Sequence, residues 1–216
     1  MHSIISIVGK SHSGKTTLLE SLIVELKRRG YKVAIVKHSH HPNDLDIADK
    51  DTWRFTRAGS EISAINSLDH LAIYRRTEDY FDPQEISSFI LWDYDVILTE
   101  GFKSSHYPKI EVHRGEQGKE LLTDPQQLLA VVTDEPLDVK VPQFSRDDIA
   151  GIAELIEKTI NTRQRENDID LIVNGANIPV SAPLKDLLVR TLVAMIPVPQ
   201  GNGEVKSLHI SLRRKS

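Results

Sequence analysis

Short apolar runs separated by helical stretches dominate the first two thirds of the chain. The run from Ile4 to Val8 is rich in β-branched residues and stops at Gly9, which predicts a buried parallel strand. Apolar residues then recur at helical spacing from Leu18 to Leu26, and Gly30 supplies the stop. The run from Tyr31 to Lys37 predicts a second strand. A strand, a helix and a strand of these lengths form a βαβ unit, so we expect an α/β fold with a mostly parallel sheet flanked by helices.

The same alternation of short runs and helices continues along the chain. Six further runs predict strands: Ile62–Ile65, Leu71–Tyr74, Val96–Thr99, Ile110–His113, Leu128–Val132 and Val141–Phe144. Helices are predicted over Pro83–Leu91 and Asp147–Thr162. Ser145, three residues before Asp148, indicates a capping box at the start of the second helix.

A polar stretch from Arg163 to Asp168 separates that helix from a different pattern. We expect a main α/β domain over residues 1–163 and a small C-terminal module over residues 168–216. The module contains an expected hairpin around Asn174-Gly175, a helix and a one-faced strand: Leu171–Val173 with Ala176–Val180, Leu184–Met195 and Val205–Leu212. Fewer than about fifty residues rarely fold alone, so we expect the module to pack on the main domain, to mediate dimerisation or to dock a partner.

Composition restricts the chemistry. The 216 residues include 27 Lys and Arg and 31 Asp and Glu, for a formal net charge of −4. No cysteine is present, which removes thiol nucleophiles, iron–sulfur ligation and cysteine zinc sites. No basic stripe is available for a nucleic-acid backbone, so nucleic acid is not an expected partner. The N-terminal apolar run is too short for a signal peptide or a membrane span, and we expect a cytoplasmic protein without a membrane partner.

The loop between the first strand and its helix carries the candidate chemistry. It matches the P-loop pattern G-x-x-x-x-G-K-[ST] in the strand–loop–helix context that this pattern requires. Its residues are Gly9, Lys10, Ser11, His12, Ser13, Gly14, Lys15 and Thr16. Backbone N–H groups of such a loop converge on phosphate oxygens at a helix N-terminus. Lys15 is expected to pair with the β- and γ-phosphates, and the hydroxyl of Thr16 is expected to bind Mg²⁺.

A metal ion beside a P-loop needs carboxylates at the carboxyl ends of neighbouring strands. Glu100 follows one predicted strand and is preferred over Asp95, which precedes the same strand. After the second strand, Asp44 and Asp46 are candidates to hold Mg²⁺ and to position an attacking water. Lys15, Asp44 and Glu100 are the expected catalytic residues.

Three histidines, His38, His40 and His41, lie in the same loop as these aspartates. Histidine is the commonest metal ligand, but the three lie on one irregular segment without a regular ligand spacing. Three roles stay open for these histidines: they hydrogen-bond to phosphate or water, they bind a transition metal, or they are simply exposed at the surface.

These motifs together resemble the family of molybdopterin-guanine dinucleotide biosynthesis protein B (MobB). The matching blocks follow the family's order between about residues 3 and 160: Gly9–Thr17, Lys37-His38 with His40-His41, Asp44–Asp46, Lys50–Arg54, Arg57–Gly59, Thr99–Lys103 and Thr133–Pro136. The resemblance implies a dimeric P-loop protein that binds GTP and Mg²⁺ and is a weak GTPase at most. It also implies an accessory role beside the nucleotidyltransferase MobA, which joins GMP to molybdopterin, with a molybdoenzyme or molybdopterin as further partners.

The resemblance implies roles for individual residues. Phosphate would be held by Gly9, Lys10, Ser13, Gly14, Lys15, Thr16 and Thr17, with Ser11 and His12 in the same loop. Asp44, Asp46 and Glu100 would surround the metal together with the P-loop hydroxyl. Thr133 and Asp134, at the exit of a late strand, match the block where the family meets the base, although the chain has no N-K-x-D element.

The family also implies slow hydrolysis. A missing arginine finger lowers phosphoryl-transfer rates by about 10³- to 10⁵-fold. No arginine is placed by a motif here, although Arg54 and Arg57 follow the carboxylate loop and could approach the phosphates. Two other functions stay open: a metallochaperone GTPase that uses the histidine loop, and a small-molecule P-loop kinase with Asp44 or Asp46 as the base. The kinase is disfavoured because no helical segment carries an arginine cluster for a lid.

Overall fold

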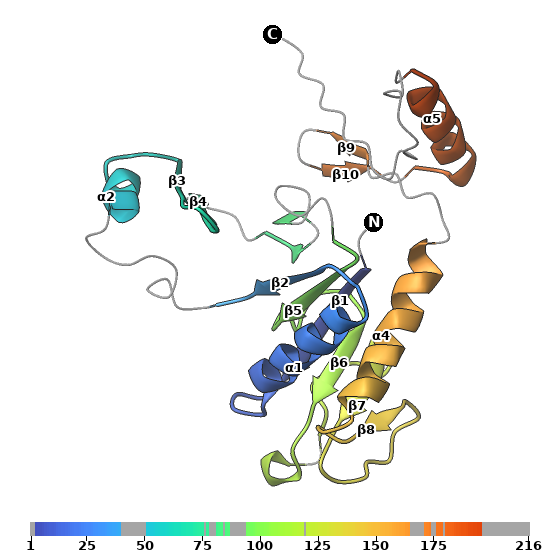
Figure 1. The fold of residues 1–216 in the computed structure, drawn as a ribbon. Helices are drawn as coiled ribbons and strands as arrows, with labels where there is room; N and C mark the ends of the chain where they lie inside the picture. Colours follow the sequence, from blue (N-terminus) through green and yellow to red (C-terminus); the bar gives the residue numbers. More distant parts are fainter. Residues whose placement is uncertain are drawn as a thin grey trace.

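A six-stranded sheet forms the centre of the structure. The computed structural model describes residues 3–39, 51–75, 77, 81–83, 85–86, 94–118, 120–164, 171–173, 176–178 and 180–195. The sheet has the order β2-β5-β1-β6-β7-β8, and every neighbouring pair is parallel (Figure 1). Its strands are β1 (Ser3–Gly9), β2 (Val33–Lys37), β5 (Val96–Glu100), β6 (Lys109–Val112), β7 (Leu128–Val132) and β8 (Gln143–Phe144). The predicted α/β class with a mostly parallel sheet is confirmed.

Two helices, α1 (Lys15–Arg28) and α4 (Ile149–Gln164), cover one face of this sheet (Figure 1). Their apolar stripes pack on alternate strand residues, because successive side chains of a strand point to opposite faces. Ile5 and Ile7 of β1 share one fully buried cluster with Leu22 of α1 and Ile156 of α4. The opposite face carries a smaller cluster made of Ile4, Ala34, Val36, Ile97, Phe102 and Tyr107.

The ends of the two helices are set by local hydrogen bonds. At the end of α1, Gly30 has a φ of 93°, its N–H donates to the carbonyl of Lys27, and the Tyr31 N–H donates to that of Leu26. This is a Schellman motif, and it confirms Gly30 as the stop. At the start of α4, Asp148 caps the helix by accepting the Gly151 N–H at 3.0 Å. The capping box predicted at Ser145 is wrong, because Ser145 offers its backbone carbonyl to the Asp148 N–H instead.

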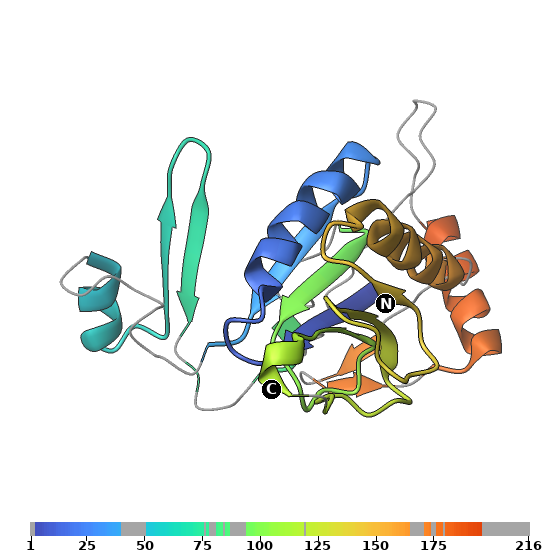
Figure 2. The same cartoon turned by 90° about the horizontal axis from the view of Figure 1, so that it is seen from below.

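An arm made of α2 (Asp51–Arg57), β3 (Ile62–Asn66) and β4 (Leu71–Arg75) stands apart from the sheet (Figures 1 and 2). The two strands pair only with each other and are antiparallel. One face of this hairpin lies against α2, where Thr56 Oγ1 and the buried Ser63 Oγ are 3.4 Å apart. The predicted strands are therefore present, but they form a separate two-stranded sheet.

The C-terminal segment contains the hairpin and the helix that the sequence predicts. β9 (Leu171–Val173) and β10 (Ala176–Ile178) pair antiparallel, and α5 (Ala182–Met195) follows them. The Asn174-Gly175 turn, the strand expected over 205–212 and most of the helix expected over 83–91 lie outside the described residues. No helix in the described part of the chain is long and apolar enough to cross a membrane.

Candidate nucleotide-binding site

The P-loop begins and ends at glycines whose backbone conformations other residues rarely adopt. Gly9, the last residue of β1, has a φ of 148°, and Gly14, directly before α1, has a φ of 96°. A Cβ at Gly9 would lie 2.4 Å from the carbonyl oxygen of Val112 in β6, so the loop leaves the sheet where only glycine fits. Within the loop, the Ser13 N–H donates to the Lys10 carbonyl at 3.3 Å.

The loop offers several groups that suit a phosphate. The first turn of α1 contains no acidic residue, and no side chain caps its N-terminus, so the positive helix end is left for an anion. Among the described residues, Ser13 Oγ is buried without a hydrogen-bond partner. The Lys15 ammonium donates to the Lys10 carbonyl at 2.6 Å. Burial lowers the pKa of Lys15, the Glu100 carboxylate raises it, and Lys103 lowers it. These donors fit the phosphates of a nucleotide.

The metal side of the site lies between β1 and β5. Thr16 Oγ1 donates to both carboxylate oxygens of Glu100, at 3.1 Å each. The parallel register pairs Ile7 with Glu100, which brings the carboxylate to the same edge of the sheet as the P-loop. Asp95, at the other end of β5, instead accepts the Lys32 N–H at 2.7 Å. A hydroxyl beside a carboxylate is the oxygen set that Mg²⁺ prefers, so Thr16 and Glu100 fit this ion.

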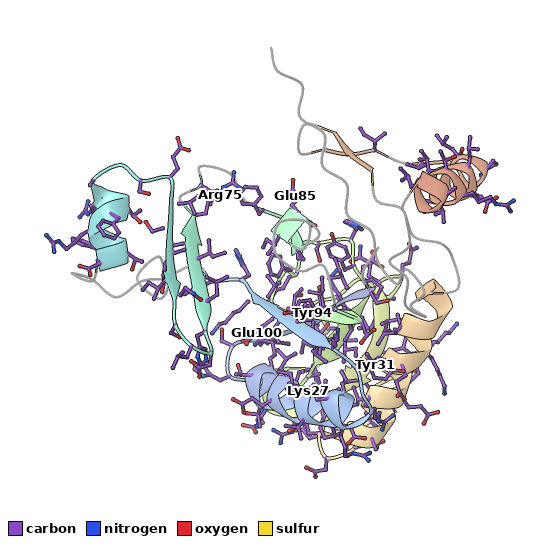
Figure 3. All side chains as sticks on the ribbon, turned by 45° about the horizontal axis from the view of Figure 1, so that its top comes forward. Lys27, Tyr31, Arg75, Glu85, Tyr94 and Glu100 are labelled. Carbon is purple, nitrogen blue, oxygen red and sulfur yellow. The ribbon has the colours of Figure 1, made fainter. Side chains whose placement is uncertain are left out.

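Figure 3 shows Glu100 at the end of the sheet nearest the β3–β4 hairpin, with Tyr31 towards the opposite end of α1. Directly after Glu100 the chain turns sharply, because Gly101 and Phe102 have φ values of 96° and 56°. The His38 N–H donates to the Glu100 carbonyl at 3.0 Å, and the rings of His38 and Phe102 are 5.3 Å apart. His38 therefore borders the metal side of the site.

The rest of the predicted carboxylate and histidine loop, with Asp44, Asp46, His40 and His41, lies outside the described residues. Within the part of the chain that the structure describes, no group of three or more His, Cys, Asp or Glu residues is arranged to hold a metal. The roles of these four residues stay predictions.

Thr133 and Asp134 follow β7, on the other side of the P-loop strand from Glu100. The Thr133 hydroxyl holds its own turn, donating to the Glu135 carbonyl at 2.8 Å and accepting the Glu135 N–H at 3.2 Å. Asp134 accepts the Gly115 N–H at 3.1 Å. That hydrogen bond lowers the pKa of Asp134, and the positive charges of Arg146 and Arg114 add to the effect.

Two arginines beside the P-loop were not predicted. Arg114 Nε donates to the carbonyl of Ser13 at 3.1 Å, and Arg146 reaches the same loop from the end of β8. Their place in the sequence could have indicated them, because each follows a strand whose carboxyl end faces a ligand crevice. Arg54 and Arg57, the arginines considered from sequence, lie on α2, where Arg54 pairs with Asp51 at 3.8 Å and Arg57 stacks over Trp53 at 5.0 Å.

The chain has a P-loop NTPase-like nucleotide-binding fold. Its sheet is parallel, a loop bounded by glycines leads into a helix, and Thr16 faces the carboxylate of Glu100 on the neighbouring strand. The family model of MobB, described as molybdopterin guanine dinucleotide synthesis protein B, matches residues 4–134. The chain belongs to this family.

Known relatives and structures agree with this membership. The chain is 37% identical over 163 residues to the molybdopterin-guanine dinucleotide biosynthesis adapter protein of Haemophilus influenzae, covering 73% of this chain and 89% of the relative. It is 24% identical to the putative adapter protein of the same name from Methanocaldococcus jannaschii, covering 97% of both. The crystal structure of molybdopterin-guanine biosynthesis protein B (mobB) aligns with a TM-score of 0.57 at 33% identity, covering 72% of this chain and 98% of that chain.

Proposed function

We propose that this chain is a GTP-binding adapter protein in the synthesis of the guanine dinucleotide form of the molybdenum cofactor. Nucleotide binding is supported above all by the contact of Thr16 Oγ1 with both carboxylate oxygens of Glu100. This contact lies at the edge of the sheet where Lys15 begins α1. The names of the relatives support the adapter role. The geometry thus supports nucleotide binding, and family membership supports the role in this pathway.

Each residue has a distinct task in this proposal. The loop N–H groups and Lys15 bind the phosphates, and Thr16 and Glu100 hold Mg²⁺, with Asp44 and Asp46 as expected further ligands. When bound, Mg²⁺ neutralises charge on the phosphate oxygens. Arg114 and Arg146, which reach the P-loop, come from the side opposite Glu100. This position supports slow hydrolysis, since neither is next to the metal side where the γ-phosphate would lie.

Self-association is proposed to use the β3–β4 hairpin. On its face away from Ser63 lie Ile62, Leu71 and Ile73, whose exposed fractions are 56%, 63% and 49%. Burying the exposed half of such a side chain contributes about 1 kcal/mol or more each, which supports a homodimer formed through this face. A Leu71→Glu, Ile73→Glu variant should sediment as a monomer, whereas Val24→Glu on the exposed side of α1 should leave the dimer intact. A wild-type monomer at micromolar concentration would refute the dimer.

The remaining assignments concern partners and location. We propose a MobA-like nucleotidyltransferase as the protein partner, with a molybdoenzyme or molybdopterin as further candidates, and a cytoplasmic site of action. Residues 168–216 are proposed as a separate packing, dimerisation or docking module. The different coverage by relatives supports that division, because the match to the Haemophilus influenzae protein spans 73% of the chain and that to the Methanocaldococcus jannaschii protein 97%.

Calorimetric titration with Mg-GTP and Mg-ATP tests the nucleotide proposal. Lys15→Ala should abolish binding, and Glu100→Gln should weaken the magnesium-dependent part of it. The matched control is Asp95→Asn, a carboxylate at the opposite end of the same strand, which should leave nucleotide affinity unchanged. Equal effects of Glu100→Gln and Asp95→Asn, or unchanged binding by Lys15→Ala, would overturn the site. Binding of ATP alone would instead favour a small-molecule kinase.

A further inference from the structure

The P-loop receives a hydrogen bond from a residue on another strand that the proposed function does not use. Arg114 follows β6, and its Nε donates to the carbonyl of Ser13 at 3.1 Å, across 101 positions of the sequence. A Cβ placed at Gly14 would lie 3.4 Å from Nη2 of the same side chain. The guanidinium therefore lies against the two loop residues that precede α1.

This hydrogen bond uses a group of the loop that a phosphate leaves free. The N–H groups of a P-loop converge on phosphate oxygens, and those oxygens accept hydrogen bonds. The Ser13 carbonyl is an acceptor as well, so a nucleotide does not compete for it. Arg114 can therefore keep its bond to the loop while the loop holds a phosphate.

Two hydrogen bonds within the loop involve donors that a phosphate attracts. The Ser13 N–H donates to the Lys10 carbonyl at 3.3 Å, which is long for a bond of this kind. The Lys15 ammonium donates to the same carbonyl at 2.6 Å. The buried Ser13 hydroxyl has no hydrogen-bond partner among the described residues. The bond from Arg114 differs from these two, because its acceptor is not needed by the ligand.

The segment that carries Arg114 is itself anchored to β7 and to the turn after it. The His113 N–H donates to the Val132 carbonyl at 2.8 Å, and the Gly115 N–H donates to the Asp134 carboxylate at 3.1 Å. These bonds hold the backbone on both sides of the arginine. Arg114 therefore connects the P-loop to a fixed part of the sheet.

We propose that Arg114 is a positioning residue of the nucleotide site: its bond to Ser13 keeps the P-loop in the conformation that binds phosphate before a ligand arrives. This inference rests on the nucleotide site proposed above. When a loop is competent for only a fraction of the time, the affinity for its ligand falls by that fraction. The loss of one charge-assisted hydrogen bond should reduce the competent fraction about tenfold. Arg114 then acts without touching the nucleotide.

Arg146 provides a matched control, because it brings the same charge to the same residue of the loop. A Cβ placed at Gly14 would lie 3.6 Å from its Nη1. Within the described part of the chain, however, Arg146 makes no hydrogen bond to the P-loop. Arg146→Gln therefore removes a charge without removing a bond. It should weaken nucleotide binding by less than about threefold, since the charge is exposed and screened by salt.

The test measures the affinities of the full chain for Mg-GTP, Mg-ATP and inorganic tripolyphosphate by calorimetry. Arg114→Gln should lower all three by about tenfold, because the loop and not the nucleoside is affected. Lysine has a methylene group where arginine has Nε, so Arg114→Lys keeps the charge but loses this donor. It should therefore lose most of the affinity that Arg114→Gln loses. Urea denaturation shows whether both variants are folded.

Two further measurements distinguish a positioned loop from a direct contact with the ligand. Binding kinetics with a fluorescent GTP analogue should show the loss in the association rate constant, because fewer molecules have a competent loop. In the nucleotide-free protein, amide hydrogen exchange over residues 9–17 should be faster in Arg114→Gln than in wild type and unchanged in Arg146→Gln. A general loss of stability would instead raise exchange throughout the sheet.

The outcomes separate this inference from the proposed function. If wild-type protein binds none of the three ligands, the nucleotide site fails and the inference fails with it. If wild-type protein binds them and Arg114→Gln binds them equally well, the site stands and the positioning role is overturned. Equal losses in Arg114→Gln and Arg146→Gln would show that charge alone matters. A loss confined to GTP, or found only in the dissociation rate constant, would show direct contact with the nucleotide. Either of these results overturns the positioning role as well.

Discussion

Gly9→Ala probes how closely the P-loop is attached to the sheet. The new Cβ would lie 2.4 Å from the Val112 carbonyl oxygen and 2.8 Å from Ser13 Oγ. An ordinary van der Waals contact needs a distance about 1 Å longer than this, and the nearest atom belongs to the backbone of β6. β1 and β6 therefore have to move apart where Gly9 pairs with Val112. The positive φ adds strain of about 1–3 kcal/mol, and each weakened ladder hydrogen bond adds about 1 kcal/mol. We expect a loss of about 2–5 kcal/mol in the free energy of unfolding.

The matched control is Gly30→Ala at the other end of α1. Gly30 also has a positive φ, 93°, but no atom lies within 4 Å of the position that its new Cβ would take, so only strain of about 1–2 kcal/mol is expected. Urea denaturation gives both unfolding free energies, and calorimetry gives GTP affinity. A displacement of about 1 Å at the loop should weaken binding roughly a hundredfold in Gly9→Ala, or about 2.7 kcal/mol, and not in Gly30→Ala. Equal stability and equal affinity of the two variants would refute the steric argument.

Three further predictions follow from individual side chains. Burial lowers the pKa of Lys15 below its usual 10.5, and a bound phosphate raises it again. GTP affinity should therefore be constant near neutral pH and fall as pH rises above the lowered pKa. A profile that stays flat through the usual 10.5 would exclude Lys15 as a phosphate ligand. Hydrogen bonds from Arg28 and Arg29 lower the pKa of Glu25 to about 2, so its stabilising effect should be complete above its usual 4.5 and disappear as pH falls through about 2. The difference in unfolding free energy between wild type and Glu25→Gln, followed by acid titration, measures this, and a difference that persists below pH 2 would contradict it. Glu111→Ala should lower the unfolding free energy by about 2–4 kcal/mol, because the buried Glu111 carboxylate accepts the N–H groups of Leu122 and Thr123. The control is Glu116→Ala at an exposed position, which should change the unfolding free energy by less than about 0.5 kcal/mol.

The position of Glu100 beside the P-loop was predictable because it follows from strand direction. The P-loop pattern fixes a strand, a loop and a helix, and parallel strands place their carboxyl ends at one edge. Glu100 was preferred over Asp95 on this ground alone. The structure places Glu100 against Thr16 and Asp95 against the Lys32 N–H at the other end of the strand.

Strand β6 shows where an alternating pattern misleads. The sequence of β6 and the residue after it, Lys109 to His113, alternates polar and apolar residues, which is typical of a strand with one solvated face. In the structure Lys109, Glu111 and His113 are only 1%, 2% and 4% exposed. Loop groups replace water here, since the Lys109 ammonium donates to the Tyr107 carbonyl at 3.0 Å and to Gln127 Oε1 at 2.7 Å. Periodicity reports which residues share a face, but it does not report what covers that face.

The arginines beside the P-loop escaped prediction for a related reason. A guanidinium lies several bonds from its backbone, so its final position depends on neighbours from other strands and not on a spacing in the sequence. Arg114 and Arg146 are 32 positions apart and match no motif, yet both reach Gly14. Arg54 and Arg57 lie closer in sequence to the expected metal ligands Asp44 and Asp46. They are nevertheless part of α2, which belongs to the separate arm. For long cationic side chains, the order of strands in the sheet is thus a better guide to the site than nearness in sequence, because it fixes which loops share the edge that binds the ligand.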